Sequence, residues 1–177
     1  MVLAPSVLAS DLPPDEEALI LTRALAYDRN LRARAGDELT LAVLVRAGDS
    51  QSLAKAQRVH ASFRGLEKHT VQGLPFRAVL VEYSNPTQFK NVVTQYDIDV
   101  VYIADGMSQA LSTITALARA QKFSTLGAEV DYVREGGLCL AVTVYENQPR
   151  ILLNRAAAEQ EGASFGAGLL RLAKMVN

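Results

Sequence analysis

The order of apolar and polar residues along the chain predicts alternating strands and helices. Residues 39–45, 78–81 and 100–104 are short, nearly unbroken apolar runs, which is typical of strands buried on both faces of a parallel sheet. Each run is followed by a segment whose apolar residues recur every three or four positions, the pattern of an amphipathic helix. This alternation predicts βαβ units, with right-handed connections that place helices on both faces of the sheet.

A further helix is predicted ahead of the first strand. It begins at Pro13 and Pro14, because proline is tolerated in a first helical turn, and the carboxylates that follow suit its positive end. The core-facing stripe consists of Ile20, Ala24, Tyr27 and Leu31. Asp28 interrupts this stripe, and Gly36 ends the helix.

The C-terminal third predicts a different local structure. Residues 123–126 predict a short strand. In residues 138–145, leucine and valine alternate with other residue types, which predicts another strand. Residues 150–153 predict the strand that runs back beside it after a turn containing Pro149. The last two segments predict an antiparallel hairpin at one side of the sheet. The predicted fold class is therefore α/β, a single three-layer domain with a mainly parallel sheet and a C-terminal antiparallel hairpin.

Two helices are predicted to close the chain. Asn154 is expected to cap a short helix that Gly162 ends, and Ser164 is expected to cap the last helix. The inner stripe of this last helix consists of Phe165, Leu169, Leu172 and Val176. The glycines of residues 162–168 follow a helix rather than a strand, so they indicate a helix–helix joint and not a phosphate-binding loop.

Composition narrows the functional classes. The 177-residue chain has a net charge of -1, 49% hydrophobic residues and no tryptophan, which argues against disorder and against nucleic-acid binding. The single cysteine, Cys139, excludes a disulfide within this chain. No apolar run approaches the roughly 20 residues that span a bilayer, so we expect no membrane-spanning segment.

The N-terminal residues resemble part of an export signal. Residues 2–10 are apolar and rich in small side chains, and Val7-Leu8-Ala9 is similar to a signal-peptidase site, although the basic segment that normally precedes one is missing. We therefore expect residues 1–14 to be a leader or signal-peptide remnant and residues 15–177 to be one α/β domain. The alternative is a leader that is flexible or that packs loosely on the domain.

Candidate catalytic and metal-binding residues are few. Ser52 and Lys55 match the S-x-x-K pattern of some serine hydrolases, but its companion motifs are absent, so Ser52 is expected to serve the first turn of a helix. His60 and His69 have no neighbouring ligands at zinc-binding spacing. We expect no catalytic residue, metal or cofactor. Two groups of acidic residues are expected to remain solvated. Asp97 and Asp99 lie at a strand entrance, and Glu129, Asp131 and Glu135 lie in a polar loop.

One candidate binding site follows from the predicted topology. Open α/β sheets bind ligands beyond the carboxyl ends of their strands, where helix starts offer free N–H groups. The predicted ligand contacts at those ends are Asp49, Ser50, Ser84, Asn85, Asp105, Gly106, Ser108 and Glu129, with Ser52 and Gly127 nearby. The competing interpretation is that these serine, aspartate and asparagine residues only cap helices, which is a sufficient reason for their presence.

Several segments of the chain resemble the YfiR-like family. The resemblance is most specific near the C-terminus, in Glu135-Gly136-Gly137-Leu138, in the hairpin strand Arg150-Ile151-Leu152-Leu153-Asn154, and in Leu169-Leu170-Arg171-Leu172-Ala173-Lys174. The link Val71-Gln72-Gly73-Leu74-Pro75 is also similar to that of the family. Two features depart from the family: Cys139 has no partner cysteine, and residues 32–37 lack the aromatic–proline pair found after the first helix.

The resemblance implies a fold similar to one lobe of a periplasmic solute-binding protein. It also implies a non-catalytic exported regulator that binds the extracytoplasmic part of a membrane diguanylate cyclase or sensor and holds it inactive. Homodimerisation is a further expectation, with the Ala- and Gly-rich residues 156–168 as the contact. The alternatives are a single-lobe small-molecule binding protein and a hydrolase using Ser52 and Lys55. A cytoplasmic location is the alternative to export.

Overall fold

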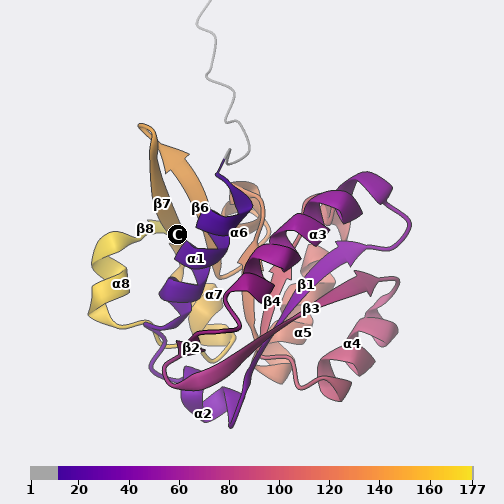
Figure 1. Ribbon diagram of the computed structural model, residues 1–177, viewed down its shortest axis with the longest axis horizontal. Helices are drawn as coiled ribbons and strands as arrows, with labels where there is room; N and C mark the ends of the chain where they lie inside the picture. Colours follow the sequence, from indigo (N-terminus) through magenta and orange to yellow (C-terminus); the bar gives the residue numbers. More distant parts are fainter. Residues whose placement is uncertain (1–11, 177) are drawn as a thin grey trace, which may run out of the picture.

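The computed structural model describes residues 12–176, which form one domain around an eight-stranded sheet (Figure 1). The strands are β1 (Leu39–Arg46), β2 (Thr70–Val71), β3 (Leu74–Tyr83), β4 (Val100–Ile103), β5 (Ser124–Gly127), β6 (Leu140–Tyr145), β7 (Gln148–Asn154) and β8 (Lys174–Val176). Their order in the sheet is β2-β3-β1-β4-β5-β6-β7-β8. Strands β3, β1, β4, β5 and β6 run parallel to one another. Strand β2 is antiparallel to β3, and β7 is antiparallel to β6.

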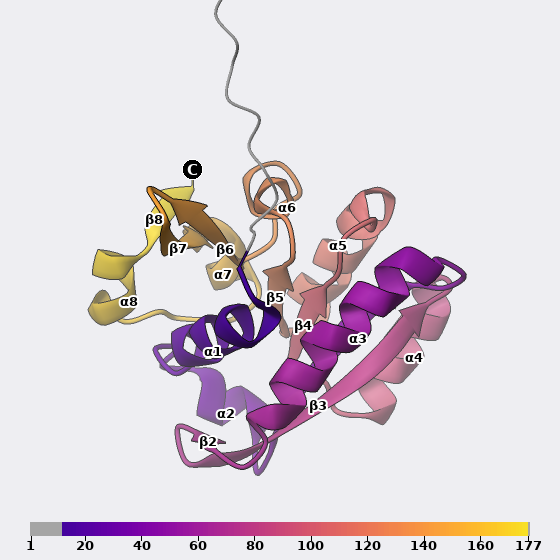
Figure 2. The same ribbon diagram turned by 45° about the horizontal axis from the view of Figure 1, so that its top comes forward.

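Helices cover both faces of this sheet, as Figure 2 shows. The helices are α1 (Pro14–Leu25), α2 (Leu31–Ala35), α3 (Ser50–Gly65), α4 (Pro86–Gln95), α5 (Leu111–Gln121), α6 (Val130–Arg134), α7 (Arg155–Gln160) and α8 (Ala167–Leu172), with a 3-10 turn at Ser108–Ala110. One apolar core lies under α1 and α3, and a second lies under α4, α5 and α6. The predicted three-layer α/β fold with a C-terminal hairpin is confirmed.

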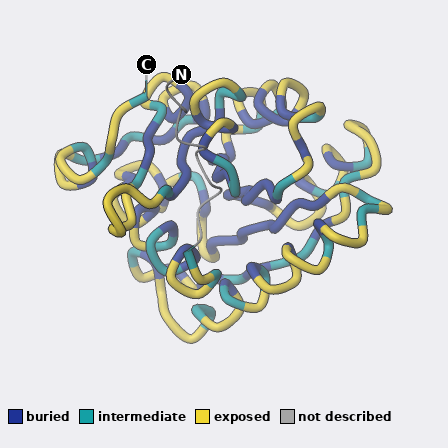
Figure 3. The backbone as a smooth tube through the Cα atoms, turned by 90° about the horizontal axis from the view of Figure 1, so that it is seen from above, coloured by how far each residue is buried: buried dark blue, intermediate teal, exposed yellow. Residues whose placement is uncertain are grey.

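The apolar runs of the sequence lie at the centre of the domain. Every residue of β1 except Arg46 is buried, and all four residues of β4 are buried. Figure 3 shows buried positions along the central strands and exposed positions on the outer helical turns. Aromatic rings fill both cores: Phe63 packs edge-on against Tyr102 with ring centroids 5.7 Å apart, and Phe89 packs edge-on against Phe123.

The single first helix predicted from the sequence is wrong, because the chain breaks between α1 and α2 at Asp28. This side chain is fully buried and accepts hydrogen bonds from the backbone N–H groups of Asn30 (3.0 Å) and Ser164 (2.7 Å). It also forms an ion pair with Arg34. The turn lets the carboxylate reach these donors, and it leaves Tyr27, predicted to be a core residue, 41% exposed.

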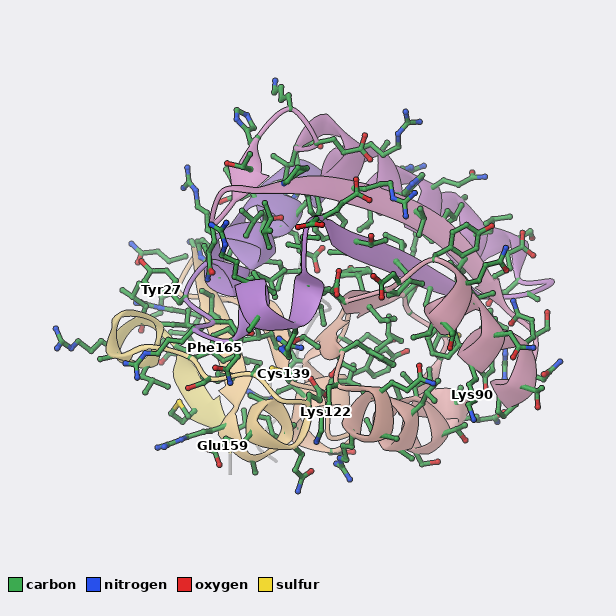
Figure 4. All side chains as sticks on the ribbon, turned by 90° about the horizontal axis from the view of Figure 1, so that it is seen from below. Tyr27, Lys90, Lys122, Cys139, Glu159 and Phe165 are labelled. Atoms are coloured by element: carbon green, nitrogen blue, oxygen red, sulfur yellow. The ribbon has the colours of Figure 1, made fainter. Side chains whose placement is uncertain are left out.

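The predicted last helix is also wrong in its extent. Helix α8 ends at Leu172, and the residues that follow form β8, which pairs parallel to β7. Leu172, predicted to face inward, is 61% exposed. Ser164 does not cap α8, whose N-cap is Gly166. The N–H of Ser164 instead donates to Asp28, which joins the loop before α8 to the turn after α1. Figure 4 places Phe165 near Tyr27 at this junction.

Other differences from the predicted elements are small. Residues 70–75 form a tight antiparallel hairpin, with Gln72 and Gly73 both at positive φ in its turn. The polar loop predicted around Asp131 contains the short helix α6, which buries Tyr132 and Val133. Residues 1–11 of the expected leader lie outside the described residues. No helix within residues 12–176 is both long enough and apolar enough to cross a membrane.

Removing the Asp28 charge tests whether this buried contact holds the N-terminal turn to the C-terminal loop. Asp28→Asn is expected to lower the free energy of unfolding by about 3–5 kcal/mol, since it leaves the largely buried Arg34 guanidinium without its counterion. The control Glu159→Gln breaks the exposed Arg155–Glu159 pair and is expected to cost less than about 1 kcal/mol. Urea denaturation measures both, and equal small losses would contradict the assigned role of Asp28.

Candidate functional site

The chain reverses its direction of winding at β1. It passes from β1 through α3 to β3 on one side, and then through α4 to β4 on the other side of β1. The helices that follow β1 and β4, α3 and α5, therefore lie on opposite faces of the sheet. The carboxyl ends of these two strands form a topological switch point, the usual ligand-binding position in an open α/β sheet.

A cavity of about 550 Å³ lies at this switch point, on the face covered by α1 and α3. The start of α1, the inner side of α3, the end of β4 and the segment after β5 form its walls, an arrangement that can be followed in Figure 2. Its apolar lining consists of Leu12, Pro13, Pro14, Ala56, Val59, Ala104 and Ala128. Its polar lining consists of Glu17, Lys55, Arg58, Tyr102, Asp105 and Glu129. Volumes of roughly 300–1,000 Å³ are typical of small-molecule sites.

Glu17 is the most buried acidic group of this cavity, with only 6% of the residue exposed. The Tyr102 hydroxyl donates a hydrogen bond of 3.0 Å to Glu17 Oε1 and joins α1 to β4. Burial raises the pKa of Glu17 from 4.5 to about 7, although the hydrogen bond from Tyr102 acts in the opposite direction. Burial, together with the Glu17 charge, also raises the pKa of Tyr102 well above its usual range. The Glu17 carboxyl is therefore partly protonated at neutral pH.

An ion pair crosses the outer part of the cavity. Lys55 Nζ lies 2.7 Å from Asp105 Oδ2, and this contact, with smaller contributions from Glu129 and Asp49, raises the pKa of Lys55. Glu129 Oε1 accepts a long hydrogen bond of 3.4 Å from the backbone N–H of Gly106. Both members of the Lys55–Asp105 pair remain partly exposed, so the pair itself contributes little to stability.

The structure brings together only some of the predicted ligand contacts. Asp105 and Glu129 line the cavity. Asp49 and Gly106 lie close to one another beside it: Gly106 is at a φ of +78°, and a Cβ atom there would lie 3.4 Å from Asp49 Oδ2 and 3.1 Å from Ser52 Oγ. This close approach of the loop after β4 to the start of α3 requires glycine.

The other predicted contacts do not line the cavity. Ser84 and Asn85 follow β3, and Asn85 Oδ1 caps α4 by accepting a 2.9 Å hydrogen bond from the N–H of Gln88. Asp49 likewise caps α3 through the N–H of Ser52, which holds the pKa of Asp49 below its usual range. Ser50 and Ser108 are exposed at helix starts. The capping interpretation is thus confirmed for Asp49 and Asn85.

Ser52 and Lys55 do not contact one another as a catalytic pair would, because each binds a different carboxylate. The Ser52 hydroxyl donates a 2.8 Å hydrogen bond to Asp49 Oδ2, whereas Lys55 pairs with Asp105. A lysine engaged in an ion pair is protonated and cannot accept a proton from serine. Neither histidine adds to this site, since His60 contacts the carbonyl of Ala78 and His69 is exposed.

Two more buried carboxyls lie elsewhere. Asp99 accepts a 2.9 Å hydrogen bond from the N–H of Thr40, and burial raises the pKa of Asp99 to about 6, so the predicted solvated strand entrance is wrong for this residue. Glu161 accepts hydrogen bonds from the N–H and hydroxyl of Thr125, and burial raises its pKa to about 8. Within residues 12–176, no three acidic, histidine or cysteine side chains come together as metal ligands.

Sequence reasoning missed Glu17 and Tyr102 as components of the cavity. Glu17 lies among acids at a helix start, where a carboxylate is expected for helix stability alone. Tyr102 lies in an apolar strand, where an aromatic residue is expected to fill the core. One feature of the sequence could have indicated Glu17. It lies on the same helical face as Ala18 and Leu21, which is the buried face of α1.

A family model described as YfiR/HmsC-like matches residues 25–174 of the chain. A search of curated protein sequences found no match to this chain. Solved structures share its fold at low identity. A conserved domain protein from Vibrio cholerae O1 biovar eltor aligns with a TM-score of 0.64 and 15% identity, over 93% of this chain and 60% of that chain.

Two binding-protein structures align comparably. One is an ABC domain in complex with L-Trp from Streptococcus pneumonia, with a TM-score of 0.59, 12% identity and coverage of 93% of this chain and 62% of that one. The other is a ligand-free, open substrate-binding protein with adhesive properties from Clostridium difficile, with a TM-score of 0.59, 13% identity and coverage of 88% and 59%. The chain thus has a periplasmic-binding-protein-like fold and spans about 60% of the length of each of these structures.

Glu17→Gln is expected to change how stability depends on pH. The pKa of Glu17 is about 7 in the folded chain and near 4.5 when unfolded, so the unfolded chain loses this proton first as pH rises. The contribution of Glu17 to the free energy of unfolding is therefore complete below pH 4.5. It decreases by at most about 3 kcal/mol as the pH rises through 7. Urea denaturation between pH 4.5 and 8 should show a smaller loss for Glu17→Gln than for the unsubstituted chain. Asp99 and Glu161 titrate in both proteins, so parallel profiles would contradict the burial of an ionisable Glu17.

A serine-reactive fluorophosphonate probe is expected to leave the folded protein unlabelled, because the Ser52 hydroxyl donates to Asp49, a carboxylate of lowered pKa and so a weak base, while Lys55 is engaged by Asp105. Labelling measured on the intact chain, with Ser52→Ala as the control, provides the check. Labelling that disappears in Ser52→Ala would instead establish a nucleophilic serine.

Proposed function

Because this chain belongs to the YfiR/HmsC-like family, we propose that it is a non-catalytic exported regulator that binds and restrains a membrane signalling protein such as a diguanylate cyclase. The family match over residues 25–174 is the observation that carries this proposal, and it supports a periplasmic regulatory role in general. The partner is the extracytoplasmic part of the membrane protein, which this chain contacts from outside the bilayer.

Regulation by this mechanism requires two conformations with different affinities for the partner. The cavity supplies a place where a small ligand can favour one of them. Its walls include the start of α1 and the middle of α3, and both helices also present outer faces to solvent. A ligand between α1, α3 and β4 therefore acts on the spacing of helices that are available for partner contact.

A second candidate function is small-molecule binding in its own right, as a single-lobe solute-binding protein. The cavity at the switch point favours it, as does the fold shared with a substrate-binding protein and with a domain solved in complex with L-Trp. In this alternative the ligand is the cargo, whereas in the first proposal it controls a protein contact. Both give the same edge of the sheet a binding role.

Self-association is part of the proposal. Within the predicted contact, residues 156–168, Ala157, Ala158 and Ala163 are buried in the chain, whereas Ala156, Ala167 and Gly168 are exposed and available for it. Some of the large exposed apolar side chains also lie near the hairpin tip and the C-terminal edge of the sheet, and these are Val144, Tyr145, Leu172 and Met175.

Cellular cyclic-di-GMP provides the test of the regulatory proposal. Expressing the chain with an export signal, together with a membrane diguanylate cyclase of its own genome, is expected to lower cyclic-di-GMP severalfold and to yield a periplasmic crosslink between the two proteins. The same chain expressed without the export signal is the matched control and should change nothing. Folded exported protein that leaves cyclic-di-GMP unchanged and crosslinks to no cyclase would contradict regulation and favour the solute-binding alternative.

A further inference from the structure

The cavity at the switch point carries an excess of negative side chains. Glu17, Asp105 and Glu129 line it, and Asp49 is close enough to its lysine to affect the lysine pKa. The positive charge of Lys55 is already used by Asp105, at 2.7 Å. Arg58, the other base in the lining, is an exposed residue of α3. With Glu17 ionised, the lining carries three negative and two positive side chains, which favours a cation over an anion.

Two of these carboxyls have spare capacity to accept hydrogen bonds. Within residues 12–176, the Glu17 carboxyl has a single hydrogen-bond donor, the Tyr102 hydroxyl. Glu129 accepts the long 3.4 Å contact from the N–H of Gly106 and lies close to the Tyr132 side chain. An ionised carboxylate offers about four acceptor sites, so each group has room for another donor.

The remaining lining limits what kind of cation fits. Leu12, Pro13, Pro14, Val59 and Ala56 form an apolar wall that interacts poorly with a hydrated inorganic ion. The described part of the chain also brings together no set of three metal-ligating side chains. An organic cation, with one charged group and an apolar body, satisfies both parts of the lining.

We propose that this cavity binds a small organic amine in its protonated form, with the ammonium group at the Glu17 carboxyl and the apolar body against the wall formed by Leu12, Pro13 and Val59. The inference deepens the proposed function, since it names the chemical class of the ligand through which partner binding is regulated. Tyr102 positions the Glu17 carboxyl through its hydrogen bond, and Glu129 adds a second negative charge.

Binding of an ammonium group is coupled to proton release from Glu17. Below the pKa of about 7 the neutral carboxyl offers no charge, and the cation binds only after the proton leaves. The charged and titratable groups around Glu17 are Lys55 and Arg58 from α3, Tyr102 from β4, Asp105 and Glu129 from the following loops, and Asp15 and Glu16 from its own helix. Burial brings the pKa of Glu17 to about 7, so this carboxyl exchanges its proton near neutral pH.

Isothermal titration calorimetry with phenethylamine and hexylamine tests the inference, with phenethyl alcohol and hexanol as neutral counterparts of the same shape. The amines are expected to bind more tightly than the alcohols, and about tenfold more tightly at pH 8 than at pH 6, since the ionised fraction of Glu17 changes by that factor. Phenylacetate, an anion, is expected not to bind.

Two variants locate the binding site. Glu17→Gln keeps the shape and an acceptor for Tyr102 but removes the charge, so it should abolish both the preference for amines and its pH dependence. Glu16→Gln removes a neighbouring exposed carboxylate of the same helix that does not line the cavity, and it should behave like the unsubstituted chain. Retained urea-denaturation transitions show that both variants are folded.

Three results would overturn the inference: no heat of binding from either amine, equal affinity for amines and alcohols, or amine binding that Glu17→Gln leaves unchanged. Each of these leaves the cyclase experiment untouched, because partner binding is measured there without added ligand. Conversely, an exported chain that binds amines but never lowers cyclic-di-GMP would sustain the site and contradict the regulatory role.

Discussion

The reversal of winding at β1 determines where this molecule has a site. Because α3 and α5 leave the sheet on opposite faces, the carboxyl ends of β1 and β4 are not covered by a common layer of helices. Helix α1 partly closes the gap on one face, and it places Glu17 against Tyr102 of β4. A buried carboxyl beside a cavity results, and the proposed ligand chemistry depends on it.

The central strands could be predicted from the sequence because a strand buried on both faces has little choice of residues. Residues 39–45, 78–81 and 100–104 are apolar apart from Thr40, and they correspond to β1, the middle of β3, and β4. The hairpin of β6 and β7 was likewise predictable from alternation and a turn, in which Glu146 and Asn147 adopt positive φ. The caps Asp49, Asn85 and Asn154 could be identified because each is a polar residue just before an amphipathic segment.

The remaining structure depends on contacts between residues far apart in the chain, which local patterns do not encode. Asp28 ends α1 because its partners include Ser164, 136 residues away. Residues 174–176 continue an apparent helical stripe, yet they form β8 because the free edge of β7 offers backbone partners. Glu17 could be placed in the cavity only once α1 was known to bring it within hydrogen-bond distance of Tyr102 in β4, and no spacing within α1 gives that information.

The ionisation of Glu17 tests this account most directly. In a ¹³C NMR titration of the glutamate side-chain carboxyls, with the Glu17 signal assigned by its loss in Glu17→Gln, the account predicts a midpoint near pH 7. A midpoint close to 4.5, the value of a carboxyl in water, would mean that Glu17 is solvated, and neither the described cavity nor its preference for a cation would stand.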